Sequence, residues 1–156
     1  MKTKKTSMKI FLGADHAGFE LKEHVKKYLQ KSGMKVEDKG AHKFSPQDDY
    51  PDFIVPVAKK VAEDPINSRG IIFGSSGQGE AIAANKIKNV RAALYYGGDI
   101  KIVKLSRTHN NSNILSLGAR VLAKEEAVKA VKLWLETDFS NEPRHVRRIK
   151  KINKVK

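Results

Sequence analysis

A glycine-rich segment at residues 74–80, Gly-Ser-Ser-Gly-Gln-Gly-Glu, gives the strongest chemical signal in the sequence. It leaves a predicted strand and enters a predicted helix, and its glycines allow several backbone N–H groups to converge. Together with the positive end of the helix dipole, such a nest of donors suits a phosphate or a developing oxyanion. The segment is not a Walker loop, because no Gly-Lys-Ser/Thr follows, and its glycine order differs from the dinucleotide-binding fingerprint. An ordinary tight strand–helix turn is the alternative interpretation.

Four acidic or imidazole groups lie in positions from which they could move protons or bind anions. Glu80 begins the helix after the glycine-rich segment, and it is either a general base or only a favourable partner of the helix dipole. Asp15 and His16 follow the first predicted strand, where they could bind hydroxyls and phosphate or simply cap a helix. His109 follows a predicted helix, and alone it is typical of a surface or capping histidine.

Basic residues near the end of the chain could bind phosphate. Arg144, Arg147 and Arg148 form a cluster, and Arg120 follows the fifth predicted strand. Guanidinium groups bind phosphate through paired contacts, so these residues could form a clamp. A solvated helix face is the alternative for the cluster.

Short apolar runs alternate with amphipathic stretches along the whole chain. Strands are expected at residues 9–13, 34–38, 70–73, 91–95 and 113–117. Helices are expected at residues 19–31, 50–63, 80–87, 99–108, 124–136 and 143–152. This alternation predicts a parallel sheet with helices on both faces.

In sheets of this kind, ligands bind beyond the carboxyl ends of the strands. Applied to the predicted strands, the rule selects four loops as candidate parts of one site. They are residues 13–18, 74–80, 95–98 and 108–112.

Composition excludes several other classes of protein. The chain has 156 residues, 40% of them hydrophobic, which favours one globular domain with a real core. It contains no cysteine, so disulfides, thiolate metal sites and a cysteine nucleophile are excluded. No apolar run is long enough to span a membrane or to serve as a signal-peptide core, which predicts a cytoplasmic protein without membrane partners.

The net charge of +14 is concentrated at the two ends of the chain. Residues 1–9 and 141–156 together carry +10 and contain no Phe, Trp or Tyr. Nucleic-acid binding by such segments would call for interleaved aromatic residues, so we expect solvated ends and no nucleic-acid partner. Residues 1–8 are predicted to be a disordered basic extension, followed by a single domain at 9–156 with a basic C-terminal helix.

Taken together, these motifs resemble the ribose-5-phosphate isomerase B and galactose-6-phosphate isomerase family. The resemblance lies in GADHAGFELKEHVKKYL (13–29), DYPDF (49–53), GSSGQGEAIAANK (74–86), RTHNNSNILSLGAR (107–120) and the pair Arg144/Arg148. It implies a Rossmann-like three-layer α/β/α sandwich with a five-stranded parallel sheet. It also implies a homodimer, or a homotetramer of two dimers, with the active site between subunits and no metal or organic cofactor.

The resemblance assigns roles to individual residues. Glu80 matches the base of one branch of the family, with Ser76 assisting it and His109 opening the sugar ring. Gly74 occupies the position at which another branch carries a cysteine base. Residues matching substrate contacts are Asp15, His16, Tyr50, Ser75, Gly77, Gln78, Gly79, Asn110, Arg120, Arg144 and Arg148.

The expected activity is the interconversion of ribose 5-phosphate and ribulose 5-phosphate through an enediolate. The alternative is isomerisation of a six-carbon aldose phosphate, galactose 6-phosphate or allose 6-phosphate. The galactose enzymes of the family are usually built from two different subunits. A chain that itself supplies Glu80, His109 and the arginines therefore favours ribose 5-phosphate.

Overall fold

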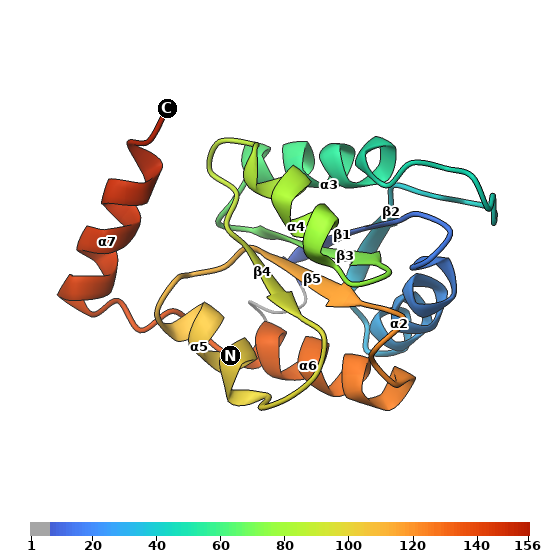
Figure 1. Ribbon diagram of the computed structural model, residues 1–156. Helices are drawn as coiled ribbons and strands as arrows, with labels where there is room; N and C mark the ends of the chain where they lie inside the picture. Colours follow the sequence, from blue (N-terminus) through green and yellow to red (C-terminus); the bar gives the residue numbers. More distant parts are fainter. Residues whose placement is uncertain (1–6) are drawn as a thin grey trace.

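A computed structural model describes residues 7–156 of the chain; the predicted N-terminal extension falls mostly on residues outside this range. Five parallel strands form one sheet in the order β2-β1-β3-β5-β4 (Figure 1). The strands are β1 (Lys9–Ala14), β2 (Lys35–Asp38), β3 (Ser68–Gly74), β4 (Ala92–Tyr95) and β5 (Ile114–Gly118). Strands β1, β3, β4 and β5 are apolar or small at their centres, as expected for a sheet covered on both faces, whereas the edge strand β2 (KVED) is mostly charged.

Helices cover both faces of this sheet, which makes the fold a three-layer α/β/α sandwich (Figure 1). The helices are α2 (Phe19–Lys31), α3 (Pro51–Glu63), α4 (Gln78–Asn85), α5 (Lys101–Thr108), α6 (Lys124–Glu136) and α7 (Pro143–Asn153). Apolar side chains of α2, α5 and α6 pack in one core cluster, and those of α3 and α4 pack in another. The predicted fold class is therefore confirmed.

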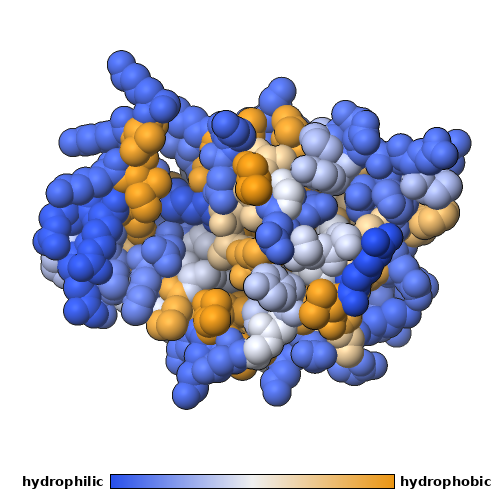
Figure 2. All heavy atoms as spheres, in the orientation of Figure 1, coloured by the Kyte–Doolittle hydropathy of each residue, from blue (hydrophilic) through white to orange (hydrophobic). Residues whose placement is uncertain are grey.

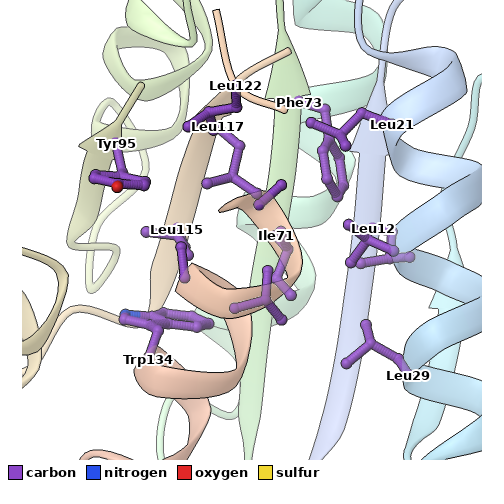
Figure 3. Packing of buried hydrophobic residues seen from close by; sticks show 14 of the residues in the cluster. Leu12, Leu21, Leu29, Ile71, Phe73, Tyr95, Leu115, Leu117, Leu122 and Trp134 are labelled. Atoms are coloured by element: carbon purple, nitrogen blue, oxygen red, sulfur yellow. The ribbon is translucent and has the colours of Figure 1, made fainter. Parts of the chain in front are cut away.

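The larger core cluster lies between the sheet and helices α2, α5 and α6 (Figure 3). Leu12 and Ile71 extend from neighbouring strands toward Leu29, and all three are almost completely buried. Trp134 closes the other end of the cluster, and its indole N–H donates a hydrogen bond to Ser112 Oγ (2.8 Å). A buried indole needs such a partner, so this bond allows α6 to keep its largest side chain in the core.

Helix α7 differs from the others because it stands away from the sandwich (Figure 1). Residues 137–142 lead to it from the end of α6. Its side chains form a strongly amphipathic pattern, and Figure 2 shows an apolar strip along it among basic residues. Ile152, near the end of α7, is an exposed member of that apolar side, and Val155 just beyond the helix is exposed as well. One face of α7 is thus left without a partner among residues 7–156.

The predicted elements match the observed ones closely, but one site assignment was wrong. Residues 108–112 lead into β5. Asn113, between this loop and the strand, bonds near the starts of the neighbouring strands: its N–H donates to Arg91 O just before β4 (3.0 Å), and its carbonyl accepts from Gly70 N–H in the first half of β3 (2.9 Å). In a parallel sheet, a loop that enters a strand lies at the amino ends of the strands. The loop at 108–112 therefore lies at the edge opposite to the other three selected loops.

Candidate active site

The glycine-rich segment forms a tight turn between β3 and α4. Gly77 adopts a left-handed conformation (φ 79°), which glycine accepts without steric cost. Ser116 Oγ donates a hydrogen bond to Gly77 O (2.7 Å), and Gln78 N–H donates to Ser76 Oγ (3.3 Å). These bonds fix the turn at the N-terminus of α4, where backbone N–H groups face an incoming anion. No hydrogen bond joins Ser76 to Glu80 in this structure, although the sequence led us to expect that Ser76 assists Glu80.

Glu80 lies in the first turn of α4 and is only 4% exposed. Its carboxylate lies directly over Gly74, in the space that any side chain at position 74 would fill. Burial raises the pKa of Glu80, its own backbone N–H opposes that effect, and the charge of Asp15 raises the pKa further. A buried carboxylate with a raised pKa is better matched to proton transfer near neutral pH than a solvated one.

Tyr50 closes the site on the side of α3. It precedes that helix, and its hydroxyl lies so close to Gly79 that a Cβ there would come within 2.6 Å of it. The absence of a side chain at Gly79 thus makes room for the phenol. This contact joins the loop before α3 to the glycine-rich segment.

Asp15 and His16 lie in the turn after β1, and the structure gives each a definite partner. Asp15 is 6% exposed, and its Oδ1 accepts hydrogen bonds from Ala17 N–H (3.0 Å) and Gly18 N–H (3.3 Å). His16 Nδ1 lies 2.7 Å from Asp48 Oδ1 and 3.9 Å from Asp15 Oδ2. The side chain of Asp15 therefore stabilises the turn that leads into α2, as the capping interpretation expected. The imidazole of His16 is hydrogen bonded to Asp48.

Arg120 follows β5, lies beside the glycine-rich turn after β3, and is exposed. Its backbone N–H donates to Ser75 O (3.1 Å), and the N–H of Ala119 donates to Gly74 O (2.7 Å). These bonds bring the loop after β5 to the loop after β3. We call the residues gathered at this edge the carboxyl-end set: Asp15, His16, Tyr50, Ser75, Ser76, Gly77, Gln78, Gly79, Glu80 and Arg120.

The other predicted site residues gather elsewhere. His109 ends α5, and its ring stacks on that of His145 in α7, with centroids 4.3 Å apart and an angle of 18°. Burial, then the charges of His109 and Arg144, lower the pKa of His145. We call His109, Asn110, Arg144 and Arg148 the amino-end set. The first two lie in the loop that enters β5, and the two arginines lie on α7, whose His145 ring stacks on that of His109.

Arg107 anchors the loop that carries His109. Its guanidinium donates to Asn111 Oδ1 (2.9 Å), Ser112 O (2.6 Å) and Thr137 O (3.0 Å). Burial and then the charge of Arg69 lower the pKa of Arg107 to about 10. Because Thr137 starts the connection to α7, Arg107 ties the His109 loop to the segment that positions α7.

The two sets do not meet within one chain. Strand β3 has seven residues, and at about 3.3 Å per residue the two edges of the sheet lie roughly 20 Å apart. Glu80 lies at one edge, and His109 lies at the other. The predicted phosphate clamp of Arg120 with the α7 arginines was therefore wrong for a single chain, because these arginines belong to different edges of the sheet.

One group in the described part of the chain has the composition of a metal site. Asp15, His16 and Asp48 each offer a ligand atom, and these atoms lie within 4.8 Å of one another. His16 Nδ1 is already hydrogen bonded to Asp48, so a metal ion at that nitrogen would have to break the bond.

Asp48 and His145 are the site residues that sequence reasoning missed. A sequence signal for Asp48 was its position directly before the DYPDF motif (49–53).

Comparisons with known proteins show which family the chain resembles. A family model described as ribose/galactose isomerase matches residues 10–152. The chain belongs to this family. Ribose-5-phosphate isomerase B of Mycolicibacterium paratuberculosis is 42% identical over 142 residues, which cover 91% of this chain and 87% of the relative. A putative sugar phosphate isomerase of Bacillus subtilis is 37% identical over 146 residues, covering 94% of this chain and 95% of the relative.

Solved structures of other family members share the same fold. Ribose-5-phosphate isomerase B from Mycoplasma genitalium, determined with bound ribulose 5-phosphate, superposes with a TM-score of 0.90 at 39% identity, covering 94% of this chain and 95% of the other. The Clostridium thermocellum enzyme gives a TM-score of 0.87 at 40% identity, with the same coverage.

Among residues 7–156 of this chain, no helix combines the length and the apolar character needed to cross a membrane.

Proposed function

We propose that this chain interconverts ribose 5-phosphate and ribulose 5-phosphate, as a cytoplasmic enzyme of the pentose phosphate pathway. The observation that carries the proposal is the buried carboxylate of Glu80 over Gly74, beside the backbone donors of the glycine-rich segment. Its relatives named ribose-5-phosphate isomerase B support the choice of substrate. Residues 9–156 act as one sugar-phosphate isomerase domain in this proposal.

Glu80 is the base in the proposed reaction. In the open-chain aldose, its carboxylate removes the proton from C2, and the electron pair of that C–H bond forms the C1–C2 double bond of an enediolate. The negative charge then lies on oxygen, where backbone N–H groups of Ser75–Gly79 stabilise it. The protonated Glu80 returns the proton to C1 while the hydroxyl proton of O2 passes to O1, so that the C2 carbonyl and the C1 hydroxyl of ribulose 5-phosphate form. Atoms and charge balance without a redox partner.

We propose that the complete site forms between two copies of the chain. A second copy related by two-fold symmetry places its amino-end set against the carboxyl-end set of the first, which creates two equal sites per dimer. His109 of that copy then acts as the acid that opens the ring, with Asn110 contacting the substrate. His16 and Arg120 of one copy, and Arg144 and Arg148 of the other, bind the phosphate.

The experiment is an isomerase assay with the purified full chain on three substrates side by side. We expect ribose 5-phosphate to be converted with a higher kcat/KM than galactose 6-phosphate or allose 6-phosphate. Activity should persist in EDTA, because the proposed proton transfer uses no metal. Turnover of a six-carbon sugar phosphate alone would transfer the proposal to that substrate, and loss of activity on chelation, restored by a divalent ion, would contradict the metal-free mechanism.

A further inference from the structure

The loop between β2 and α3 contributes a carboxylate that none of the roles above uses. Asp48 Oδ1 accepts a hydrogen bond from His16 N–H (2.9 Å) and also lies 2.7 Å from His16 Nδ1. A single oxygen thus holds the main chain and the ring of the same residue. The side chain of Asp48 is only 10% exposed, whereas that of His16 is 27% exposed.

This contact decides which ring nitrogen His16 presents to a ligand. The aspartate oxygen is an acceptor, so Nδ1 must carry the hydrogen of the 2.7 Å bond. Nε2 is then the nitrogen left for the substrate. A phosphate oxygen is also an acceptor, so Nε2 donates to it when the ring carries both hydrogens, with Asp48 and the phosphate on opposite sides of the imidazolium.

Further contacts adjoin the ring and hold the loop that carries Asp48. Phe44 meets the ring of His16 edge-on, with centroids 6.3 Å apart. Lys22 stabilises the start of the loop between β2 and α3, because its fully buried side chain donates a hydrogen bond to Ala41 O (2.7 Å). Ala41 N–H in turn donates to Ala14 O (2.7 Å), next to Asp15. The loop that carries Asp48 is thereby joined to the strand end that carries His16.

The second oxygen of Asp48 points to a functional role for the loop. Asp48 Oδ2 is buried and has no hydrogen-bond partner among the described residues. An unpartnered buried carboxylate oxygen destabilises a folded protein, so its presence beside a binding residue indicates selection for something other than stability.

We propose that Asp48 is a positioning residue for phosphate recognition: it holds His16 with Nδ1 turned inward, so that Nε2 faces the phosphate of the substrate. This inference rests on the proposed function for its substrate. The contact between Asp48 and His16 is independent of which phosphorylated sugar binds.

The test combines substitutions at both positions with two measurements. Asp48→Ala is expected to raise KM for ribose 5-phosphate roughly tenfold or more, the usual effect of losing a hydrogen bond to a charged group, with a much smaller change in kcat. Asp48→Asn keeps an acceptor for Nδ1–H and should recover part of that loss. In a His16→Ala background, Asp48→Ala should have little further effect, because Asp48 acts through His16.

Inorganic phosphate serves as the second probe, measured by calorimetric titration of the full chain and its variants. Phosphate affinity should fall in Asp48→Ala and stay unchanged in the control Asp52→Ala, which removes an exposed carboxylate near the same loop. Nitrogen NMR of labelled histidine should show His16 Nδ1 protonated in the native protein and in Asp48→Asn, but exchanging between tautomers in Asp48→Ala.

The outcomes separate this inference from the proposed function. If the protein binds phosphate but does not isomerise ribose 5-phosphate, the proposed function fails and the phosphate titration still decides the role of Asp48. The inference is overturned if the two substitutions act independently, if only kcat falls, or if Asp48→Ala leaves phosphate affinity unchanged. Should Asp48→Ala fail to fold, Asp48→Asn carries the same comparison, and native phosphate binding by that variant with an altered Nδ1 signal would contradict the inference.

Discussion

The carboxylate of Glu80 and a side chain at position 74 would occupy the same space. The glycine at position 74 therefore leaves room for the carboxylate. The carboxylate of Glu80 fills the space beside the end of β3 that a side chain at position 74 would need. A branch of the family with a cysteine base at that position would place its sulfur in the same region. A side chain at position 74 would therefore require the carboxylate of Glu80 to move away from its present place. Within the proposed mechanism, Glu80 supplies the base from the helix because the strand leaves the space empty.

Replacing Glu80 with glutamine should remove the proton acceptor while preserving the shape of the side chain. General-base removal typically costs about 10²–10⁴ in turnover, and we expect kcat for ribose 5-phosphate to fall in that range. Exchange of the C2 hydrogen with deuterium from the solvent should be lost as well, as followed by proton NMR. His109→Asn is the matched comparison, since it should slow ring opening yet still allow exchange on the open-chain fraction. Normal exchange in Glu80→Gln would assign the base to another residue, with Asp15 the next to test.

The buried position of Glu80 also makes a prediction for stability. In the unfolded chain its pKa is close to the ordinary 4.5, and in the folded chain burial raises that pKa. Between the two values the folded chain keeps a proton that the unfolded chain has released, so the contribution of Glu80 to stability falls as pH rises through that window. Glu80→Gln should therefore be more stable than the native protein at pH 7.

Urea unfolding at several pH values measures this effect. The advantage of Glu80→Gln should shrink as pH falls toward 4.5 and below, because Glu80 is protonated in both states only below its unfolded-state pKa. Glu136→Gln, which alters an exposed glutamate on α6, should change stability little at any pH. A stability difference for Glu80→Gln that is the same at pH 7 and pH 5 would show that ionisation of Glu80 does not contribute to it.

At the scale of elements, the sequence predicted the strands and helices well because each has a simple physical signature. Strand β3 is a short apolar run that ends at a glycine, and α6 repeats its apolar residues with helical spacing. Helix α3 tolerates Pro51 in its first turn, where the missing N–H has no partner in any case. Local rules of this kind need no knowledge of the rest of the fold.

The misplacement of residues 108–112 had a different origin. The sequence suggested a loop with His109, but the edge of the sheet on which a loop lies depends on whether it leaves or enters a strand. Asp48 was missed for a related reason: its contact with His16 joins residues 32 positions apart, and no local pattern indicates which of two adjacent aspartates turns inward. Long-range pairings of this type follow from the packed fold.

Helix α7 should matter for substrate binding more than for folding of the sandwich, because it stands apart and carries Arg144 and Arg148 (Figure 1). Deleting residues 143–156 is expected to raise KM for ribose 5-phosphate roughly tenfold or more through loss of charged contacts to phosphate. Deleting residues 1–7, which removes the basic segment at the other end of the chain, should leave the kinetic constants unchanged. Steady-state kinetics, with circular dichroism as a check on folding, measure both.

The point variants Arg144→Ala and Arg148→Ala separate phosphate binding from any packing role of the helix. Each keeps the apolar side of α7 intact and should reproduce a large part of the rise in KM. Equal and small effects from the two deletions, together with native kinetics for the arginine variants, would remove these arginines from the phosphate site.

At the scale of the whole molecule, the parallel sheet imposes the division of the site. Every loop that leaves a strand lies at one edge, and every loop that enters a strand lies at the other, so Glu80 and His109 are separated by the length of the strands. No side-chain motion spans roughly 20 Å. In the dimer that we propose, two-fold pairing of identical chains removes the conflict, since the carboxyl-end set of each chain meets the amino-end set of the other.

This arrangement predicts that two inactive variants can restore each other. A dimer of one Glu80→Gln chain and one His109→Asn chain has one site that carries both substitutions and one site that carries neither. If chains exchange freely in an equal mixture, half of the dimers are mixed and each holds one native site, so activity should return to about a quarter of the native value. The mixture is assayed with ribose 5-phosphate after mild denaturation and refolding together.

The controls for this experiment are each variant refolded alone and the two variants mixed without refolding, which should show only their own residual activities. A mixture of Glu80→Gln with Glu80→Asp chains tests specificity, because both substitutions fall in the same half of the site and no native site can form. Activity of the first mixture equal to the mean of its parents would mean that Glu80 and His109 act within one chain. The roughly 20 Å that separates the two edges of the sheet makes that result incompatible with this fold.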